Sequence, residues 1–420
     1  EGVDHPYAGR VIQDIFHGEK GPKVPTPNIE ITPFNQNLDS TQIDAIRFAL
    51  FGNQPVSLIH GPPGTGKTTT IGELIKQAVH VHKMRVLVAA PSNVAVDNVL
   101  ERLVASQNEI SSKKKRGENN NTSSEKKIRA VRLGHPARIQ PSIIRYSLDA
   151  LVQNADGTEI VKDVRAEMKA HLQVASNPKS RGMERKSAYR MVKTLRKEIR
   201  QREDKVVENL LTNAQVVLCT NVGAGSYLLD RLERTKPFDL VIIDEAAQAL
   251  EVSCFASIFR GKRVVLAGDH CQLPPTIKSR HSEVQRELGK TLFERMMQRG
   301  EIVSRMLEIQ YRMHQDISDW ASKYMYNGKL QSHDSVKARK LSHLPYILSD
   351  DELKIDSTSL ISTTMNATLL LVDTAGCDLH ESVNGAGSKY NEGEAKIVSK
   401  HVRNLIHIGM KPQDIAVITP

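Results

Sequence analysis

The stretch HGPPGTGKTTT at residues 60–70 carries two glycines, a lysine and a threonine at the spacing GxxxxGK(S/T). The apolar run VSLI at 56–59 precedes it, and the helical pattern TTIGELIKQAV at 69–79 follows it. A strand, a glycine-rich turn and a helix in this order hold phosphate groups, because backbone N–H groups turn inward at the positive end of the helix. The sequence therefore predicts a phosphate-binding loop in an α/β domain. Its residues are Gly61, Pro62, Pro63, Gly64, Thr65, Gly66, Lys67, Thr68 and Thr69.

Two side chains of this loop have a predicted chemical role. We expect Lys67 to neutralise the β- and γ-phosphates of a nucleotide and the Thr68 hydroxyl to ligate Mg²⁺. A glycine-rich turn without function is the alternative, and the strand, the lysine and the threonine together argue against it. The predicted ligand is therefore a nucleotide with Mg²⁺.

A pair of acids ends the apolar run FDLVIIDEAAQ at 238–248. A buried parallel strand would deliver Asp244 and Glu245 to the carboxyl edge of the sheet. Taken alone, the pair is explained equally well as solvated surface, but a phosphate loop in the same sheet favours catalysis. We expect Asp244 to hold Mg²⁺ and Glu245 to orient and deprotonate the attacking water.

The composition bounds the class of protein. At 420 residues and 39% hydrophobic content the chain can bury two or three domain cores. Its net charge of +10 implies attraction for polyanions such as nucleic acid, although a solvated basic surface explains the charge equally well. An aromatic content of 4% weakens any base-stacking platform.

Neither membrane insertion nor secretion is expected, because the apolar runs are too short to span a bilayer and the N-terminus EGVDHPYAGRV lacks a signal pattern. The four cysteines lie far apart, without the close pairs of a zinc site or a disulfide scaffold, which fits a reducing intracellular compartment. They are Cys219, Cys254, Cys271 and Cys377.

Short β-branched runs alternate with helical patterns and predict a parallel sheet covered on both faces. The six runs are 55–60, 85–90, 128–133, 215–219, 238–245 and 263–268. Two more runs, TLLLVD at 368–373 and DIAVIT at 414–419, predict strands of a second α/β domain. We expect the first domain over 34–300 and the first part of the second over 301–420.

Three stretches fall outside the predicted sheets. Residues 1–33 contain five prolines and are predicted to be the tail of an upstream module with a linker. Residues 108–127 are polar and of low complexity, which predicts a disordered loop, and the KKKR within it fits a solvated loop or a nuclear localisation signal. Apolar residues at helical spacing over 158–211 predict a helical hairpin, within an insertion of about 140–211.

Further motifs narrow the class. In LDSTQIDAI, Gln42 lies on the first turns of a helix, where its amide could read the N6 and N7 edge of adenine, so that ATP is the predicted nucleotide. GDHCQLPP at 268–275 and QYRMH at 310–314 follow the acids. With GPPGTGKT, APSNVAVDN and DEAAQ, these motifs resemble the superfamily 1B helicases, in the subgroup of the nonsense-mediated decay helicase and senataxin. From about Leu38 to Pro420 the chain resembles this family.

Four segments resemble one branch of that subgroup, the immunoglobulin mu-binding and polymerase alpha-associated helicases. They are LGHPARI, SLDALV, LLVDTAGC and DIAVITP. The family resemblance implies a P-loop RecA-like domain with a helical-hairpin insertion, followed by a second RecA-like domain. The chain ends at ITP, before the segments that carry further family motifs, so we expect it to be a fragment. Gln315 stands where the family commonly has proline.

The resemblance also implies roles for individual residues. Gln248 and Gln272 would sense the γ-phosphate, Tyr311 would pack on the adenine, and Arg312 would reach the γ-phosphate. Glu394 would contact the nucleotide. A further set would grip the sugar-phosphate backbone of a strand, independently of its sequence. That set is Pro91, Ser92, Asn93, Thr220 and Asn221.

The predicted function is that of an ATP-dependent 5′–3′ helicase or translocase on single-stranded DNA or RNA. The alternative is a nucleotide-gated nucleic-acid-binding NTPase or scaffold that does not unwind. A small-molecule kinase would have no use for DEAAQ, GDHCQLPP and QYRMH. The family implies a monomer of the nucleus or cytoplasm, with the replication or translation machinery as partners and no membrane.

Overall fold

The computed structural model describes residues 6–115, 127–155, 158–177, 181–233, 236–344, 347 and 367–419. The chain divides into two compact units, residues 1–307 and residues 308–420. Within the described ranges, no helix is long and apolar enough to cross a membrane.

The first unit is built on a parallel sheet of seven strands in the order β3-β4-β2-β5-β6-β1-β7. All six runs predicted in this region form strands, so the prediction of a parallel α/β domain is confirmed. The seventh strand was missed, because its sequence SRM has no apolar run. The strands are β1 (Val56–His60), β2 (Val86–Ala90), β3 (Ala130–Arg132), β4 (Val216–Thr220), β5 (Leu240–Ile243), β6 (Val264–Gly268) and β7 (Ser304–Met306).

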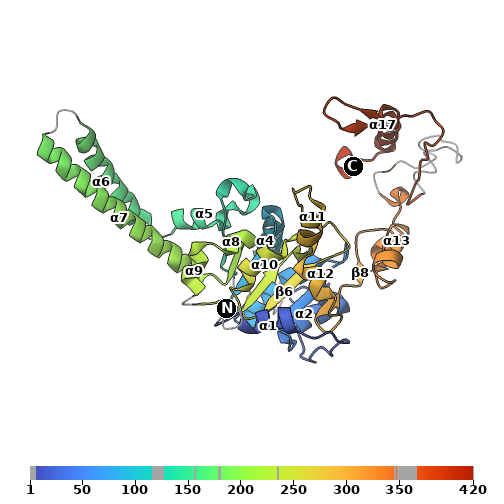
Figure 1. The fold of residues 1–420 in the computed structure, drawn as a ribbon, viewed down its shortest axis with the longest axis horizontal. Helices are drawn as coiled ribbons and strands as arrows, with labels where there is room; N and C mark the ends of the chain where they lie inside the picture. Colours follow the sequence, from blue (N-terminus) through green and yellow to red (C-terminus); the bar gives the residue numbers. More distant parts are fainter. Residues whose placement is uncertain are drawn as a thin grey trace. The chain divides into compact units, whose positions relative to one another are not determined.

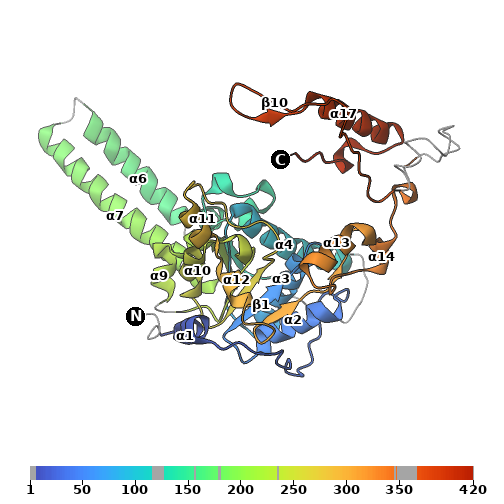
Figure 2. The same ribbon diagram turned by 45° about the vertical axis from the view of Figure 1, so that its right-hand side comes forward.

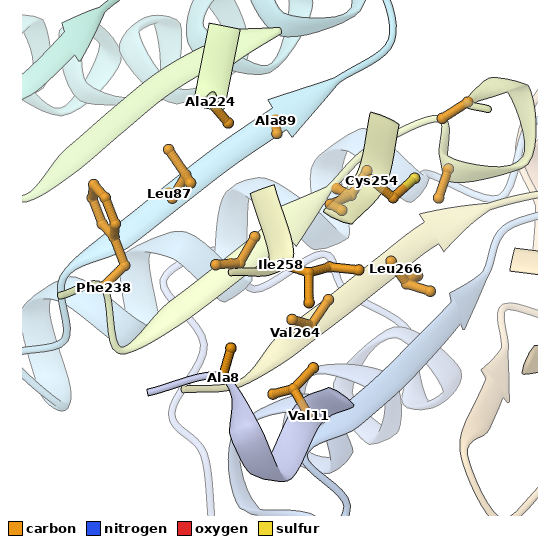
Figure 3. Close-up of a cluster of buried hydrophobic side chains, with 14 of the residues drawn as sticks. Ala8, Val11, Leu87, Ala89, Ala224, Phe238, Cys254, Ile258, Val264 and Leu266 are labelled. Carbon is orange, nitrogen blue, oxygen red and sulfur yellow. The ribbon is translucent and has the colours of Figure 1, made fainter. Parts of the chain in front are cut away.

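Two apolar cores cover the two faces of this sheet, because alternate residues of a strand point to opposite faces. In β5, Val241 and Ile243 enter one core, and Leu240 and Ile242 enter the other. Figure 3 shows the first core, where Val11 and Ile258 approach strand residues such as Val264. Helices α1 (Gly9–His17), α10 (Glu251–Ile258) and α12 (Leu292–Met297) cover this face, and α2 (Ser40–Phe51), α3 (Lys67–Lys76) and α4 (Asn93–Lys115) cover the other.

The predicted hairpin is present as α6 (Thr158–Ser176) and α7 (Gly182–Asn213), which lie side by side in both ribbon views (Figures 1 and 2). Val164, Leu195 and Ile199 form a small core between them, with Met168 packed against it. Near the sheet, α7 contacts α5 (Leu148–Gln153) and α9 (Tyr227–Glu233). The other helical segments of this unit are α8 (Asn221–Ala224), α11 (Ser282–Gly289), η1 (Gln77–Val81), η2 (Pro136–Arg138), η3 (Pro141–Tyr146) and η4 (Ala246–Gln248).

Two boundaries predicted from sequence are wrong. Residues 1–33 are not only tail and linker, because α1 buries Val11, Ile12 and Ile15 in the first core. Arg299 holds the helix by pairing with Asp14, with 2.9 Å between Nη2 and Oδ1. The prolines that suggested a linker all follow the helix or precede it, at positions 6, 22, 25, 27 and 33.

The predicted disordered loop at 108–127 also begins too early, since α4 continues to Lys115. Residues 116–126 of that prediction lie outside the described residues.

The second unit contains a parallel pair of short strands, β8 (Ile309–Gln310) and β9 (Gln331–Ser332), packed on α13 (Gln315–Met325). An antiparallel pair, β10 (Ser382–Val383) and β11 (Lys389–Tyr390), precedes α17 (Glu392–His407). The other elements in the described part of this unit are α14 (Asp334–Lys337), η5 (Leu341–His343) and η6 (Pro412–Asp414).

The strands predicted at 368–373 and 414–419 are wrong as strands of a sheet, because the described part of these runs pairs with no neighbour. Leu371 and Ile418 are each 92% exposed. A parallel strand needs hydrogen-bonding partners and covered faces, and an apolar sequence run supplies neither.

The first prediction concerns α1. Replacing Ile15 by alanine should lower the free energy of unfolding of the first unit by about 2–4 kcal/mol, because a buried isoleucine side chain is lost from the core. Thermal unfolding followed by circular dichroism measures the change. Gln13→Ala, an exposed change on the same helix, is the matched control and should shift stability by less than about 0.5 kcal/mol. Equal midpoints for both variants would show that α1 is not part of the core.

Candidate nucleotide and strand-binding site

The carboxyl ends of five neighbouring strands bring the candidate residues to one edge of the sheet. The phosphate loop follows β1, Asp244 follows β5, and Asp269 follows β6. Pro91 follows β2, and Thr220 ends β4. Ligands of open α/β sheets bind at this edge.

The phosphate loop has a backbone conformation that suits anion binding. Gly64 and Gly66 have φ values of 80° and 77°, which only glycine adopts freely. Gly66 is the residue before α3, so the N–H groups of the first helical turn remain available to an anion. The Thr65 hydroxyl donates to the Pro62 carbonyl at 2.7 Å and fixes the turn. Thr68 and Thr69, half-buried, occupy the first turn of α3.

Lys67 lies between the two predicted catalytic acids. Its Nζ is 2.6 Å from Glu245 Oε1 and 3.3 Å from Asp244 Oδ1. Burial opposes the charge of Lys67, but the two carboxylates outweigh it and raise the pKa of the ammonium. Burial raises the pKa of the Asp244 carboxyl, and the charge of Lys67 counteracts that rise. The Lys67 ammonium therefore holds the cluster together, and its removal would leave the carboxylates without a compensating charge and lower the stability of the fold.

Glu245 has a left-handed backbone conformation, with φ of 51°. A non-glycine residue in this region costs about 1–3 kcal/mol, and such strain concentrates at functional sites. Its carboxylate accepts from Lys67 through Oε1 and from Gln248 Nε2 through Oε2 at 3.1 Å. Gln248 therefore contacts the predicted base directly.

The oxygen ligands that Mg²⁺ prefers are available here, because the Thr68 hydroxyl belongs to the loop and Asp244 contacts Lys67 of the same loop. The donor set thus fits a nucleotide with its magnesium ion. Phosphate would meet helix N–H groups and Lys67, and the metal would meet two oxygen ligands.

Gln42 is buried against the phosphate loop. Its Nε2 donates to the Thr65 carbonyl at 2.9 Å, and its Oε1 accepts from the Asp39 N–H at 3.1 Å. Asp39 in turn caps α2 in a reciprocal capping box. The contact with the loop places Gln42 beside the nucleotide site, and its contact with adenine stays a prediction.

Gln272 is positioned by Asp269, whose Oδ2 accepts from Gln272 Nε2 at 2.7 Å. The other carboxylate oxygen lies 3.1 Å from Nε2 of His60, the last residue of β1. Sequence reasoning missed both His60 and Asp269. The signal was a histidine directly before the phosphate loop and an acid in the motif after the adjacent strand.

The predicted strand-binding residues lie on the neighbouring strands β2 and β4, whose register pairs Ala90 with Thr220. The segment from Pro91 to Asn93 is therefore next to Thr220. Ser92 is exposed, and its Oγ accepts from the Ala95 N–H at 3.2 Å. Thr220 Oγ1 accepts from the Gly223 N–H at 3.1 Å and caps α8. The structure thus brings the two halves of this set together.

The side chains of Asn93 and Asn221 each accept a hydrogen bond from a buried residue. Arg132, whose side chain is 0% exposed, donates from Nη2 to Asn93 Oδ1 at 2.9 Å and pairs with Asp97 through Nε at 2.8 Å. Asn221 Oδ1 accepts from the Ser257 hydroxyl at 3.4 Å. Arg132 and Asp97 position Asn93, a role that sequence reasoning missed.

Tyr311, Arg312 and Glu394 belong to the second unit. The Tyr311 ring packs on His333, with 4.6 Å between the ring centroids. Arg312 is exposed, and its backbone N–H donates to Gln310 Oε1 at 2.8 Å. Glu394 Oε1 accepts from the Thr374 hydroxyl at 2.8 Å. Their roles toward the nucleotide stay predictions.

Two family models match the chain. A model described as an AAA domain, AAA_11, matches residues 37–280, and a second AAA domain, AAA_12, matches residues 288–420.

Curated relatives resemble nearly the whole chain. "DNA-binding protein SMUBP-2" of Rattus norvegicus is 40% identical over 406 residues, which are 95% of this chain and 37% of the relative. "DNA polymerase alpha-associated DNA helicase A" of Schizosaccharomyces pombe is 37% identical over 398 residues, 93% of this chain and 54% of the relative. "ATP-dependent helicase NAM7" of Saccharomyces cerevisiae is 31% identical over 403 residues, 94% of this chain and 35% of the relative. The chain therefore spans between about a third and about half of the length of these relatives.

The second prediction concerns the buried charge of Lys67. Lys67→Ala should cost about 3–5 kcal/mol of stability, because it leaves Asp244 buried without its cation. The cost should grow with pH. Burial raises the pKa of the Asp244 carboxyl above its ordinary value, and Lys67 counteracts that rise. A carboxyl with a raised folded pKa stabilises the fold at acidic pH, and this contribution is lost as pH rises through the folded pKa. Without Lys67 the loss is larger, so the variant becomes less stable relative to the wild type as pH rises.

Thermal unfolding of both proteins at acidic and mildly alkaline pH measures this dependence. The double variant Lys67→Ala, Asp244→Asn is the control, because it removes the carboxylate and should remove the added pH dependence. A cost of Lys67→Ala that is independent of pH would contradict the pairing.

Proposed function

The chain belongs to the AAA-domain helicase family, and from this membership we propose that it couples ATP hydrolysis to movement along single-stranded DNA or RNA, in the 5′ to 3′ direction. The single observation that supports the proposal best is the ion cluster in which Lys67 of the phosphate loop contacts Asp244 and Glu245. A charged lysine and two acids at this place fit ATP hydrolysis, and the neighbouring residues of β2 and β4 fit a strand.

Bound ATP would supply the phosphoanhydride whose cleavage releases free energy, and Thr68 and Asp244 would hold a Mg²⁺ ion that neutralises charge on the phosphates. Lys67 would then exchange its contact with Glu245 for a contact with phosphate, because the phosphate oxygens carry more negative charge than the single carboxylate. The exchange frees the Glu245 carboxylate to orient and deprotonate a water. Gln248 keeps hold of the other oxygen of Glu245 and so positions that carboxylate.

Strand binding is assigned to residues on the adjacent part of the same edge. Ser92 offers an exposed hydroxyl, and Thr220 ends the neighbouring strand with a hydroxyl of its own, so both side chains are candidates for contact with a sugar-phosphate backbone. Such contacts do not depend on base sequence, so binding should fall steeply with salt concentration. Tyr311, Arg312 and Glu394 remain assigned to the nucleotide, as the family resemblance implies.

The whole protein's partners are also proposed from this family. We place single-stranded nucleic acid first, with the replication or translation machinery as the setting, and we propose a monomer of the nucleus or cytoplasm. The words "DNA-binding protein" and "DNA helicase" in the names of two relatives support DNA as one substrate.

The deciding experiment measures ATP turnover by the full-length protein with and without single-stranded DNA and RNA. Stimulation by either strand supports a motor, and duplexes with a 5′ or a 3′ single-stranded tail then decide the direction. Turnover that no strand stimulates would favour a nucleotide-gated binding protein over a helicase. Unwinding only from 3′ tails would overturn the direction.

The third prediction concerns Glu245. Glu245→Gln should keep ATP affinity and lose about 10²- to 10⁴-fold in turnover, because an amide cannot accept the proton of the attacking water. Equilibrium binding of ATP and steady-state phosphate release measure the two quantities. Glu251→Gln is the matched control, since this carboxylate pairs with Arg295 of α12 and is expected to leave turnover unchanged. Full turnover in Glu245→Gln would remove Glu245 as the base.

A further inference from the structure

A group of nitrogen and oxygen ligands lies beside the nucleotide contacts without belonging to them. His60 ends β1, and Asp269 and His270 follow β6, the strand hydrogen-bonded to β1. One ligand atom from each of the three residues lies within 4.8 Å of the other two. The two imidazole rings are neighbours, with 5.0 Å between their centroids.

We propose that His60, Asp269 and His270 bind a divalent transition-metal ion of the zinc type. Two imidazole nitrogens and one carboxylate oxygen are ligands that such ions accept, with further positions left to water. The ion would tie the strand before the phosphate loop to the segment that carries Gln272.

The distances fit this class of ion. Around a tetrahedral ion with bonds of about 2.0–2.1 Å, neighbouring ligand atoms lie about 3.3 Å apart. His60 Nε2 and Asp269 Oδ1 are already 3.1 Å apart. Because His270 is exposed, its ring can rotate toward the buried pair with little disturbance of the fold.

The surroundings hold the ligands in place, as outer partners do at metal sites. Asp269 accepts from Gln272 through Oδ2 and from the Cys271 N–H through Oδ1 at 3.1 Å. The ring of Phe293 is a neighbour of both histidines, with centroid distances of 6.3 Å to His60 and 6.4 Å to His270. His60 and Asp269 are buried, and His270 provides the path from solvent.

Cys271 lies next to the proposed ligands but is not one of them. Its Sγ is 3.6 Å from His270 Nε2, yet it does not join the three residues that share the cluster. A site of three ligands therefore predicts that the thiol is dispensable, which gives the test an internal control.

The fourth prediction is that the purified full-length protein, free of nucleotide and Mg²⁺, binds one equivalent of Co²⁺. Titration should produce the visible absorption bands of a Co²⁺ site with nitrogen ligands, and Zn²⁺ should displace the ion. His270→Ala should weaken Co²⁺ binding by at least about tenfold, the lower limit for loss of even an outer partner. Because His270 is exposed, this variant avoids a change in the buried core.

Three control variants decide the assignment. His281→Ala removes another exposed histidine of the same unit and should bind Co²⁺ as the wild type does. Cys271→Ser and Asp244→Asn should also keep the site. Absence of stoichiometric binding by the wild type overturns the proposal, as does unchanged binding by His270→Ala. Loss of binding in Cys271→Ser equal to that in His270→Ala overturns the three-residue ligand set, and loss in Asp244→Asn alone assigns the ion to the nucleotide site instead.

Discussion

The ion cluster of Lys67, Asp244 and Glu245 depends on one constraint, the parallel register of β1, β6 and β5. Lys67 comes from the helix after β1, and the two acids come from the end of β5, so only strands that run the same way bring their ends together. The strand order places β6 between them, and its carboxyl end supplies Asp269 to the same edge. The Gly61 N–H donates to the Gly268 carbonyl at 3.0 Å, which joins the phosphate loop to β6 directly. Both the electrostatics of the site and the conformation of the loop therefore follow from strand pairing.

Much of this arrangement could be predicted from sequence, because the signals are local. A β-branched run that ends in acids, or in a glycine-rich loop, specifies both a buried strand and the group at its end. Arg132 shows the limit. Its sequence context is that of an ordinary strand, but its guanidinium is buried and holds both Asn93 and Asp97. Such a contact joins residues far apart in the chain and leaves no periodic pattern. The same holds for His60 and Asp269, which are 209 positions apart.

The errors have a common physical cause. The runs at 368–373 and 414–419 have the composition of buried strands, but a strand forms only where another strand offers its N–H and C=O groups. In α1 an element was missed rather than wrongly predicted. Val11, Ile12 and Ile15 lie at helical spacing, but the prolines of residues 1–33 suggested a linker. Composition averaged over a long window hid a short amphipathic helix. Local sequence therefore predicts an element's propensity, and the partner decides whether the element forms and where it packs.

The proposed nucleotide residues and the proposed strand-binding residues occupy two halves of the sheet edge, and β2 lies between these halves. β2 pairs with β5 on one side and with β4 on the other. The Asp244 N–H donates to the Ala89 carbonyl at 2.9 Å, only two residues before Pro91. The acids and the proposed strand-binding segment are thus connected through one short piece of β2. Because β2 is hydrogen-bonded on both sides, we expect the loops to absorb any change on phosphate binding, and Glu245, with its left-handed backbone, is the residue best placed to change. A backbone change at Glu245 on one side of β2 would lie within a few residues of Pro91 on the other side, so the proposed coupling of ATP hydrolysis to strand binding needs no long pathway.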